Sequence, residues 1–425
     1  SKSKLNFMRN PIIAVLSIPS FLFLLISEFF SQFAMNLLNF ILLIVVFSLS
    51  KSNIAVAGVV LSFTIPSIIF GIMAGVYVDR WNKKNVLVWT NILRAIAVFP
   101  LIYLSKELFF LYFLSFLVSL VTQFFIPAET PIIPHLVKKH LLLSANALFS
   151  MGIFGSIIIA YALSGPVLLI FGTTNVFILL TILFGISAFF ALLIRIEHSK
   201  EKLSMQKINA LQEIKDAFWV IRKEKKIYHS LFLLTLLQTL ILVIAVIGPG
   251  YATNILKIEV ERFPLLFVTP AVVGMAAGAI VIGNFFHTKP KDLLAKIGLL
   301  IIGIVFLFFP HISFVTSKNI VISLNTTLPY LLDINAIHLL LIMAIVIGFA
   351  FSLVFVPSNT ILQEETTDEQ RGKIYGSLNT MVGLVSIVPV LGVGVLADLI
   401  GVGRVITIIG VFIIGVSILR FLKYK

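Results

Sequence analysis

Residues 54–84 read IAVAGVVLSFTIPSIIFGIMAGVYVDRWNKK, and this stretch decides the fold class. No charged side chain occurs in residues 54–78, and a bilayer core needs ~20 apolar residues of helix to be crossed. The charged residues Asp79, Arg80, Lys83 and Lys84 follow directly. A long apolar segment that ends in a charged loop predicts a membrane-spanning helix.

Similar apolar stretches recur along the whole chain, which predicts twelve membrane-spanning helices. The first includes an interfacial turn at Pro19. We place the helices at residues 18–49, 54–78, 85–105, 108–127, 141–170, 173–196, 229–254, 263–286, 293–313, 335–356, 373–397 and 402–422.

The composition excludes an ordinary soluble protein. Of the 425 residues, 59% are hydrophobic and 12% are charged. A typical soluble domain carries about 25% charged residues. A soluble fold could not bury so much apolar surface, because the buried fraction rises only slowly with size.

The 32 Lys and Arg residues are unevenly distributed among the predicted loops. If both termini are cytoplasmic, the cytoplasmic tails and loops hold most of them, as the positive-inside rule requires. This pattern predicts a multi-pass protein of the plasma (inner) membrane whose start is a short cytoplasmic tail, with no cleavable signal peptide. The net charge of +14 then reports topology, so no nucleic-acid partner is expected. The opposite loops contain only Lys51, Lys106, Lys257, Arg262, Lys318 and Arg404, while Arg94 lies inside a helix.

The sequence shows no recognisable catalytic motif. It contains no cysteine, which excludes disulfides and thiolate chemistry. His135, His140 and His287 lie in loops without ligand spacing, so we expect no metal and no cofactor. No nucleophile–base arrangement and no phosphate-binding Gly-rich loop occurs, which argues against an enzyme and against an ATP-driven pump.

The chain contains a tandem repeat. The run that begins at Pro127, at the end of the fourth predicted helix, resembles the run that begins at Pro357, at the end of the tenth. Two further pairs of matches, one beginning at Phe63 and Phe267 and one at Gly165 and Gly394, occur in the same order in both halves. We therefore predict an all-α membrane protein of two pseudo-symmetric six-helix bundles, at residues 1–196 and 229–425. Parallel six-helix repeats with a substrate path between them are typical of one large class of secondary transporters.

A polar segment at residues 197–228 joins the two predicted bundles. Within it Ile208, Leu211, Ile214, Phe218 and Ile221 recur at helical spacing among charged residues. This pattern predicts an amphipathic helix on the cytoplasmic surface. We interpret the segment as a linker, with a binding site for a regulatory partner as the alternative.

The loop after the second predicted helix resembles the signature of the major facilitator superfamily. That signature has a Gly followed by an Asp-Arg pair and a basic pair, here Gly75, Asp79, Arg80, Lys83 and Lys84. The resemblance implies the superfamily's twelve-helix fold and a cytoplasmic gate, in which the Asp faces the start of the eleventh helix and is attracted by its dipole. The alternative is that these charges only anchor the loop among lipid headgroups.

Three other segments are similar to the macrolide-efflux and enterobactin-exporter branch of that superfamily. They are the runs that begin at Phe125, Val356 and Gly394. The resemblance implies export of a small amphipathic molecule driven by a proton gradient. The sequence departs from the family in three places: the second copy of the signature lacks its Asp-Arg pair, the glycine series of the fifth helix survives only in part, and the fourth helix has no Arg. The last two departures weaken the case for proton coupling.

Polar stripes run along the first and fourth predicted helices. Ionisable groups at membrane depth are costly, so they are functional candidates. At 100° per residue each stripe covers one helix face, and in the superfamily both helices line the cavity. The stripes and their counterparts in the second half give these substrate-cavity candidates: Gln32, Asn36, Asn39, Ser115, Ser119, Thr122, Gln238 and Asn359.

Three charged residues in the first half are our proton-coupling candidates. They are Glu28, Glu129 and Arg94, at comparable predicted depth. An apolar cavity favours the protonated form of a carboxyl group, whereas a nearby cation favours the ionised form. We hypothesise that Glu28 carries the proton and that Glu129 or Asp79 pairs with Arg94. The alternative is a static Glu–Arg pair that only neutralises buried charge.

The leading interpretation is therefore a secondary active exporter of a small amphipathic or hydrophobic compound, working as a monomer by alternating access and proton antiport. One alternative is a lysophospholipid flippase or a siderophore or metabolite transporter of the same fold without proton coupling. Another is a membrane receptor or scaffold that transports nothing. Asp398 and Arg404, which flank the predicted outer turn between the last two helices, receive a structural role.

Overall fold

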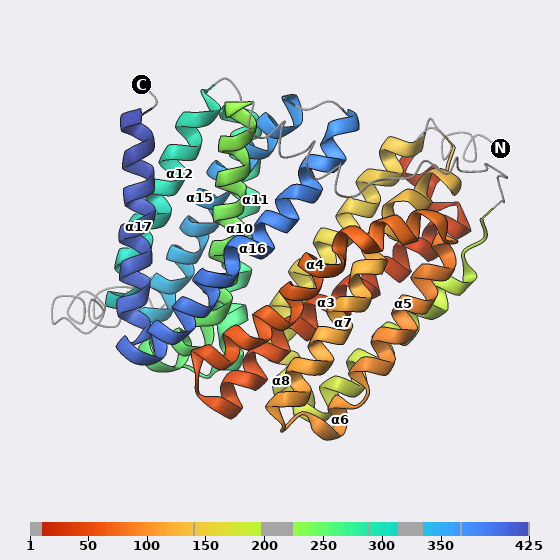
Figure 1. Ribbon diagram of the computed structural model, residues 1–425, viewed down its shortest axis with the longest axis horizontal. Coiled ribbons are helices and arrows are strands. Elements are labelled where there is room, and N and C mark those ends of the chain that lie inside the picture. The colour runs from red at the N-terminus through yellow and green to blue at the C-terminus, as the bar shows by residue number, and fades with distance from the viewer. Residues whose placement is uncertain are drawn as a thin grey trace, which may run out of the picture. The chain divides into compact units, whose positions relative to one another are not determined.

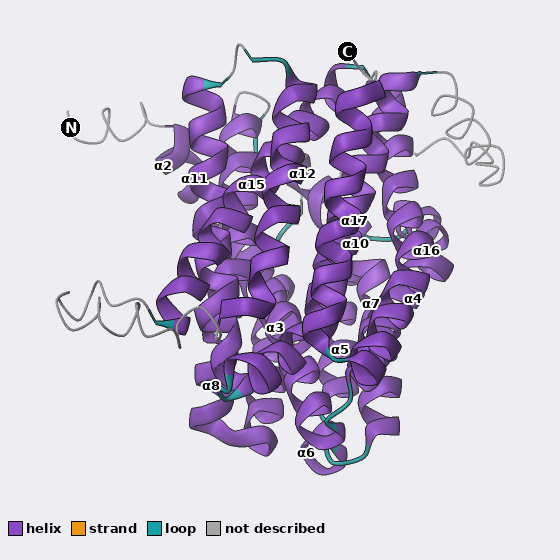
Figure 2. Cartoon of the chain, turned by 90° about the vertical axis from the view of Figure 1, so that its left-hand side faces the viewer, coloured by secondary structure: helices purple, strands orange, loops and turns teal. Residues whose placement is uncertain are grey.

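The computed structural model describes residues 11–138, 141–196, 224–286, 289–312, 335–365 and 368–423. Within these residues the chain is helical and contains no strand (Figures 1 and 2). Helices dominate because a backbone in hydrocarbon must satisfy every N–H and C=O group within the same segment or in a closed barrel. The predicted surface helix between the halves lies almost wholly outside the described residues.

The first group of helices follows the predicted spans closely. A short helix precedes Pro19, which begins the first long helix and so accounts for the predicted interfacial turn. Asn82 begins α5 as its N-cap, because its side chain accepts a hydrogen bond from the backbone N–H of Asn85. The elements are α2 (Pro11–Leu16), α3 (Pro19–Ser50), α4 (Asn53–Arg80), α5 (Lys83–Val98), α6 (Leu101–Leu104), α7 (Leu108–Glu129), η1 (Thr130–His135) and α8 (Leu142–Leu193).

The second group starts after the polar segment. Asn335 caps α15 in the same way, accepting a hydrogen bond from the N–H of His338. The elements are α10 (Lys225–Tyr251), η3 (Ala252–Leu256), η4 (Val260–Arg262), η5 (Pro264–Val268), α11 (Thr269–Phe285), α12 (Lys291–Phe308), η6 (Phe309–His311), α15 (Ala336–Glu364), α16 (Asp368–Ile400) and α17 (Val402–Lys423).

Eleven helical stretches in the described part of the chain are long and apolar enough to cross a membrane. One of them holds two helices, because Gly172 has a non-helical backbone inside α8 (φ 71°, ψ 170°). Glycine tolerates this positive φ, which strains other residues. The break falls between the predicted helices at 141–170 and 173–196. The twelve predicted spans are therefore present, and the predicted fold class is confirmed.

Backbone contacts divide the chain into two compact units. Unit 1 comprises Ser1–Leu42 and Ser62–Asn209, and unit 2 comprises Leu43–Leu61 and Ala210–Lys425. The predicted bundles at 1–196 and 229–425 stay a prediction. The units depart from it in one respect: the α3–α4 hairpin tip, residues 43–61, is assigned to unit 2.

Unit 1 is held together by side-chain contacts among α3, α5, α7 and α8. Its core contains fully or nearly fully buried Phe21, Leu24, Leu87 and Phe125. Hydrogen bonds also join α3 to α8, because Ser27 Oγ donates to the Ser187 carbonyl (2.9 Å) and Ser187 Oγ donates to the Ser27 carbonyl (2.7 Å). Hydrogen bonds between helices stabilise packing where no hydrophobic force acts.

Unit 2 packs its helices backbone against backbone. A Cβ atom on Gly348 of α15 would lie 1.8 Å from the Ala271 carbonyl oxygen of α11, and one on Gly274 would lie 2.0 Å from the Ile345 carbonyl oxygen. Gly303 of α12 and Gly410 of α17 approach in the same manner. Small residues allow this contact, which maximises dispersion attraction in lipid.

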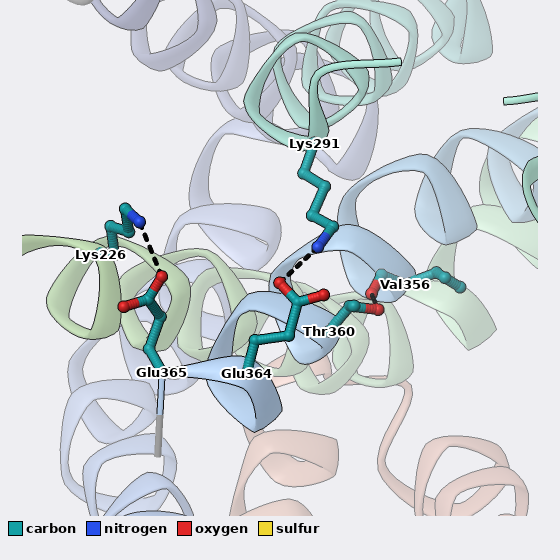
Figure 3. Close-up of polar contacts among 6 residues, drawn as sticks. All are labelled: Lys226, Lys291, Val356, Thr360, Glu364 and Glu365. Carbon is teal, nitrogen blue, oxygen red and sulfur yellow. Dashed lines mark hydrogen bonds and ion pairs between the residues drawn. The ribbon is translucent and has the colours of Figure 1, made fainter. Parts of the chain in front are cut away.

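Ion pairs join the helix ends of unit 2 on the predicted cytoplasmic side. Lys226 of α10 contacts Glu365 (2.7 Å), and Lys291 of α12 contacts Glu364 (2.5 Å), as Figure 3 shows. Solvent screens both pairs, because one side chain of each is mostly exposed, so neither pair contributes much to stability. Lys291 lies in the degenerate second copy of the signature loop, where it still has a carboxylate partner.

The glycine contacts of unit 2 lead to a stability prediction. We expect Gly348→Ala to lower the midpoint of thermal unfolding by at least about 5 °C, because the added methyl group must push α15 away from α11. Purified protein in detergent, followed by intrinsic fluorescence, provides the measurement. Gly392→Ala is the matched control, since a Cβ there meets no atom within 4 Å. Equal midpoints for the two variants would contradict the packing described here.

Candidate functional site

Two carboxyl groups meet inside unit 1. Glu28 lies in the first third of α3 and Glu129 is the last residue of α7, and their relative exposures are 1% and 8%. The amide of Gln32 bridges them, since Nε2 donates to Glu28 Oε1 (2.8 Å) and to Glu129 Oε2 (3.4 Å). The shared amide therefore holds the two buried carboxyl groups near each other.

Helix geometry accounts for this arrangement. Glu28 and Gln32 are four residues apart on α3, so they lie on the same face one turn apart. The same face continues to Met35, whose sulfur accepts a hydrogen bond from Thr122 Oγ1 of α7 (3.7 Å). The polar faces of α3 and α7 therefore meet at two levels.

The third charged group, Arg94 of α5, is 1% exposed. Its Nη2 donates to Ser31 Oγ (2.9 Å) and to Asn91 Oδ1 (2.8 Å). The guanidinium carbon lies 4.2 Å from the ring centroid of Phe125 and 5.0 Å from that of Phe184. A desolvated cation between aromatic faces can gain about 2 kcal/mol or more from such contacts.

The hypothesised ion pair between Glu129 and Arg94 is absent from this conformation. Within the described residues Arg94 has no carboxylate oxygen within 4.0 Å, although both Glu28 and Glu129 are near enough to interact with it electrostatically. Neutral hydrogen-bond acceptors and aromatic rings hold the cation instead. The alternative partner, Asp79, has a side chain outside the described residues.

Beyond Gln32, the α3 stripe leads to a tyrosine. Asn36 Nδ2 donates to the Gln32 carbonyl (2.8 Å), and Tyr161 of α8 donates its hydroxyl to Asn36 Oδ1 (3.1 Å). The Tyr161 ring packs on Phe40, with centroids 4.6 Å apart. Sequence reasoning missed Tyr161, because a lone tyrosine in an apolar helix gives no sign of its partner. Asn39, the last member of the stripe, is half-buried.

The α7 stripe has two kinds of member. Ser115 is buried, and Ser119 is committed to helix packing, because its hydroxyl donates to the Phe63 carbonyl of α4 (2.6 Å). Thr122 donates to the Val118 carbonyl of its own helix as well as to Met35. A cavity role for these three residues stays a prediction.

The candidates in unit 2 lie on separate helices. Gln238 is half-buried on α10 and Asn359 is half-buried on α15. Their role as cavity residues also stays a prediction.

Sequence reasoning missed a charged cluster in unit 2. Asp292 of α12 contacts Lys296 Nζ and Arg420 Nη2 of α17, each at 2.7 Å. Both cations are almost fully buried, at 5% and 8% exposure. Lys296 lies one helical turn from Asp292, and this spacing could have indicated the pair. We assign the cluster to helix packing, because it joins α12 to α17.

Only part of the signature motif can be described. Gly75, Asp79 and Arg80 lie in the last turns of α4, and their side chains are outside the described residues, as are those at the start of α16. Lys83 and Lys84 begin α5 and are half-buried. The cytoplasmic gate therefore stays a prediction. The described residues contain no group of three His, Cys, Asp or Glu side chains that could hold a metal ion.

Comparisons with known proteins agree with this fold. An uncharacterized MFS-type transporter of Bacillus subtilis (strain 168), YfiS, is 25% identical over 391 residues, which cover 91% of this chain and 88% of the relative. The nucleoside transporter NupG superposes with a TM-score of 0.74 at 15% identity, over 96% of this chain and 100% of that structure. A bacterial homolog of the human lysosomal transporter Spinster gives a TM-score of 0.69 at 14% identity, over 96% of this chain and 97% of that structure. These likenesses to solved structures show the fold alone.

A family model supplies the assignment that those likenesses cannot. The model of the Major Facilitator Superfamily matches residues 24–389, which include the charged site of unit 1 and most of unit 2. This chain therefore belongs to the Major Facilitator Superfamily of membrane transporters.

Proposed function

We propose that this transporter exports a small amphipathic compound in exchange for protons, by alternating access. The observation that carries the proposal is the contact of Glu28, Gln32 and Glu129 inside unit 1. Two carboxyl groups this close and this buried are strongly disfavoured when both are ionised. The pair is therefore a binding site for one proton, held between α3 and α7.

Arg94 supplies the means to release that proton. Its present partners are neutral, so the cation is free of any direct ion pair with the described carboxylates. A movement of α5 relative to α3 that brought the guanidinium onto Glu28 would favour the ionised form of that carboxyl group. Proton release would then be coupled to a conformational change, as antiport requires.

The neighbourhood of the pair favours a substrate with aromatic and cationic character. Phe29 and Phe33 follow the same helix and stack with centroids 6.2 Å apart. Aromatic faces attract apolar rings and cations. An amphipathic cation could also displace the proton by pairing with the carboxylate. The resemblance to the macrolide-efflux and enterobactin-exporter branch supports export of such compounds.

The proposal is tested by substrate-induced proton release in everted vesicles. A pH gradient is set, and cationic dyes, macrolides and lysolipids are added in turn. We expect one class to collapse the gradient in wild type, and we expect Glu28→Gln and Glu129→Gln each to reduce this collapse at least tenfold, because each removes a member of the proton site.

The matched control is Glu107→Gln, which removes an exposed carboxylate of unit 1 and should leave the collapse unchanged. Substrate uptake without gradient collapse would contradict antiport. It would point to a flippase or a metabolite transporter of the same fold in which Glu28 is a static buried group. Absence of uptake for every compound would favour a receptor or scaffold.

Arg94 gives a second prediction, on stability. Lysine keeps the charge but cannot stack flat on Phe125 and Phe184 or keep both side-chain hydrogen bonds. We expect Arg94→Lys to lower the thermal unfolding midpoint by at least about 5 °C, measured by intrinsic fluorescence in detergent. The exposed Arg195→Lys should leave it unchanged. Equal unfolding midpoints for wild type and Arg94→Lys would mean that only the positive charge of Arg94, and not its ring contacts, stabilises the fold.

The proposal places both termini in the cytoplasm of a cell with a plasma (inner) membrane. Because the chain has no cysteine, single-cysteine variants can be labelled without background. We expect Lys106→Cys to react with a membrane-impermeant maleimide in intact cells, and Lys138→Cys to react only after lysis; both side chains are exposed. The reverse pattern would invert the topology.

A further inference from the structure

The N-terminus of α4 is capped by a residue from the other end of the chain. An α-helix leaves its first N–H groups without partners in the helix. Here Asp398 of α16 accepts from the N–H of Asn53 (2.8 Å) and from that of Ile54 (3.1 Å). Ser52 accepts from the next N–H, that of Ala55 (3.4 Å).

The same carboxylate also binds two side chains of the hairpin tip. Asp398 Oδ2 accepts from Ser52 Oγ (2.6 Å), and Oδ1 accepts from Asn53 Nδ2 (2.8 Å). One carboxylate therefore receives four hydrogen bonds, all of them charge-assisted. The positive end of the α4 dipole adds to the attraction.

Glycines bring the tip close to the helices of unit 2. A Cβ on Gly394 of α16 would lie 3.0 Å from Ile54 Cα and 3.1 Å from Ala57 Cβ. A Cβ on Gly250 of α10 would lie 2.4 Å from Asn53 Oδ1. The tip therefore packs closely on α10 and α16 at these two glycines, and the polar contacts of Asp398 add to this packing.

The residues that Asp398 contacts belong to α4 and to the α3–α4 turn, and α3 and α4 are divided between the two units. Both α3 and α4 pass from unit 1 to unit 2, at Leu42–Leu43 and at Leu61–Ser62. Pro66 lies within α4 just beyond the second crossing and removes one helical hydrogen bond, which makes a local bend easier. The tip is therefore attached to unit 1 by the chain and to unit 2 by Asp398.

We propose that Asp398 is a latch that holds the hairpin tip on unit 2 and closes the predicted outer side of the transporter, and that this latch opens in each transport cycle. The inference rests on the proposed alternating access. It gives Asp398 a gating role beyond the structural role assigned from the sequence.

Labelling of a buried thiol tests the latch without any substrate. Ala57 is fully buried against α16, so Ala57→Cys reacts with an impermeant maleimide only when the tip leaves unit 2. We expect slow labelling in intact cells. We expect Asp398→Asn to raise the rate about tenfold or more, because the charge-assisted bonds are lost. Ser52→Ala, which keeps the carboxylate on the backbone N–H groups, should raise it less.

As a control for reagent access, Lys106→Cys should be labelled at the same rate with and without Asp398→Asn. Gel filtration in detergent shows whether each variant is folded. Unchanged labelling of Ala57→Cys after Asp398→Asn would overturn the proposal, as would complete absence of labelling in both backgrounds. If labelling depends on Asp398 while no compound releases protons, the latch stands and the antiport proposal fails.

Disulfide formation provides a second measurement. The Cβ positions of residues 57 and 394 are 3.1 Å apart, slightly closer than the ~3.5–4.5 Å of a disulfide, so Ala57→Cys with Gly394→Cys should cross-link under mild oxidation. We expect Asp398→Asn to slow this reaction at least threefold, because the tip spends less time packed. Cross-linking at an unchanged rate would show that the tip stays in place without the carboxylate.

Discussion

A backbone in hydrocarbon must satisfy its own polar groups, and the rest of this structure depends on that constraint. It makes every membrane-spanning segment a helix. Only the polar groups at helix ends and on side chains then need hydrogen-bond partners from elsewhere. Where α4 begins, its free N–H groups receive a carboxylate from α16. Where charges enter the core of unit 1, neutral amides, hydroxyls and aromatic rings surround them.

The spans could be predicted from sequence because length and hydropathy alone decide whether a helix can cross a bilayer. Even the break at Gly172 fell between two predicted helices. Helical periodicity predicts that Glu28 and Gln32 share one face of α3, and the family resemblance implies that α3 and α7 both line the cavity. Those predictions needed only local geometry or a known topology.

Other features depend on the rotation and tilt of each helix relative to its neighbours. These angles cannot be predicted from a single sequence. Arg94 was expected to pair with a carboxylate, yet the rotation of α5 directs it to Ser31 and Asn91. Tyr161 and Asp398 gave no signal of their partners, since these lie 125 and 345 residues away in the chain. The assignment of the hairpin tip to unit 2 has the same origin.

The backbone contacts of Gly348 and Gly274 have a consequence for how this protein can change over generations. Where a carbonyl oxygen of α11 or α15 lies this close to a glycine, a larger side chain at that position is expected to be harmful. The side chains of α3, α5 and α7 meet one another instead, and such contacts can be exchanged in pairs. Substitutions that keep the fold intact are therefore expected more readily at the side-chain contacts of unit 1 than at these glycines.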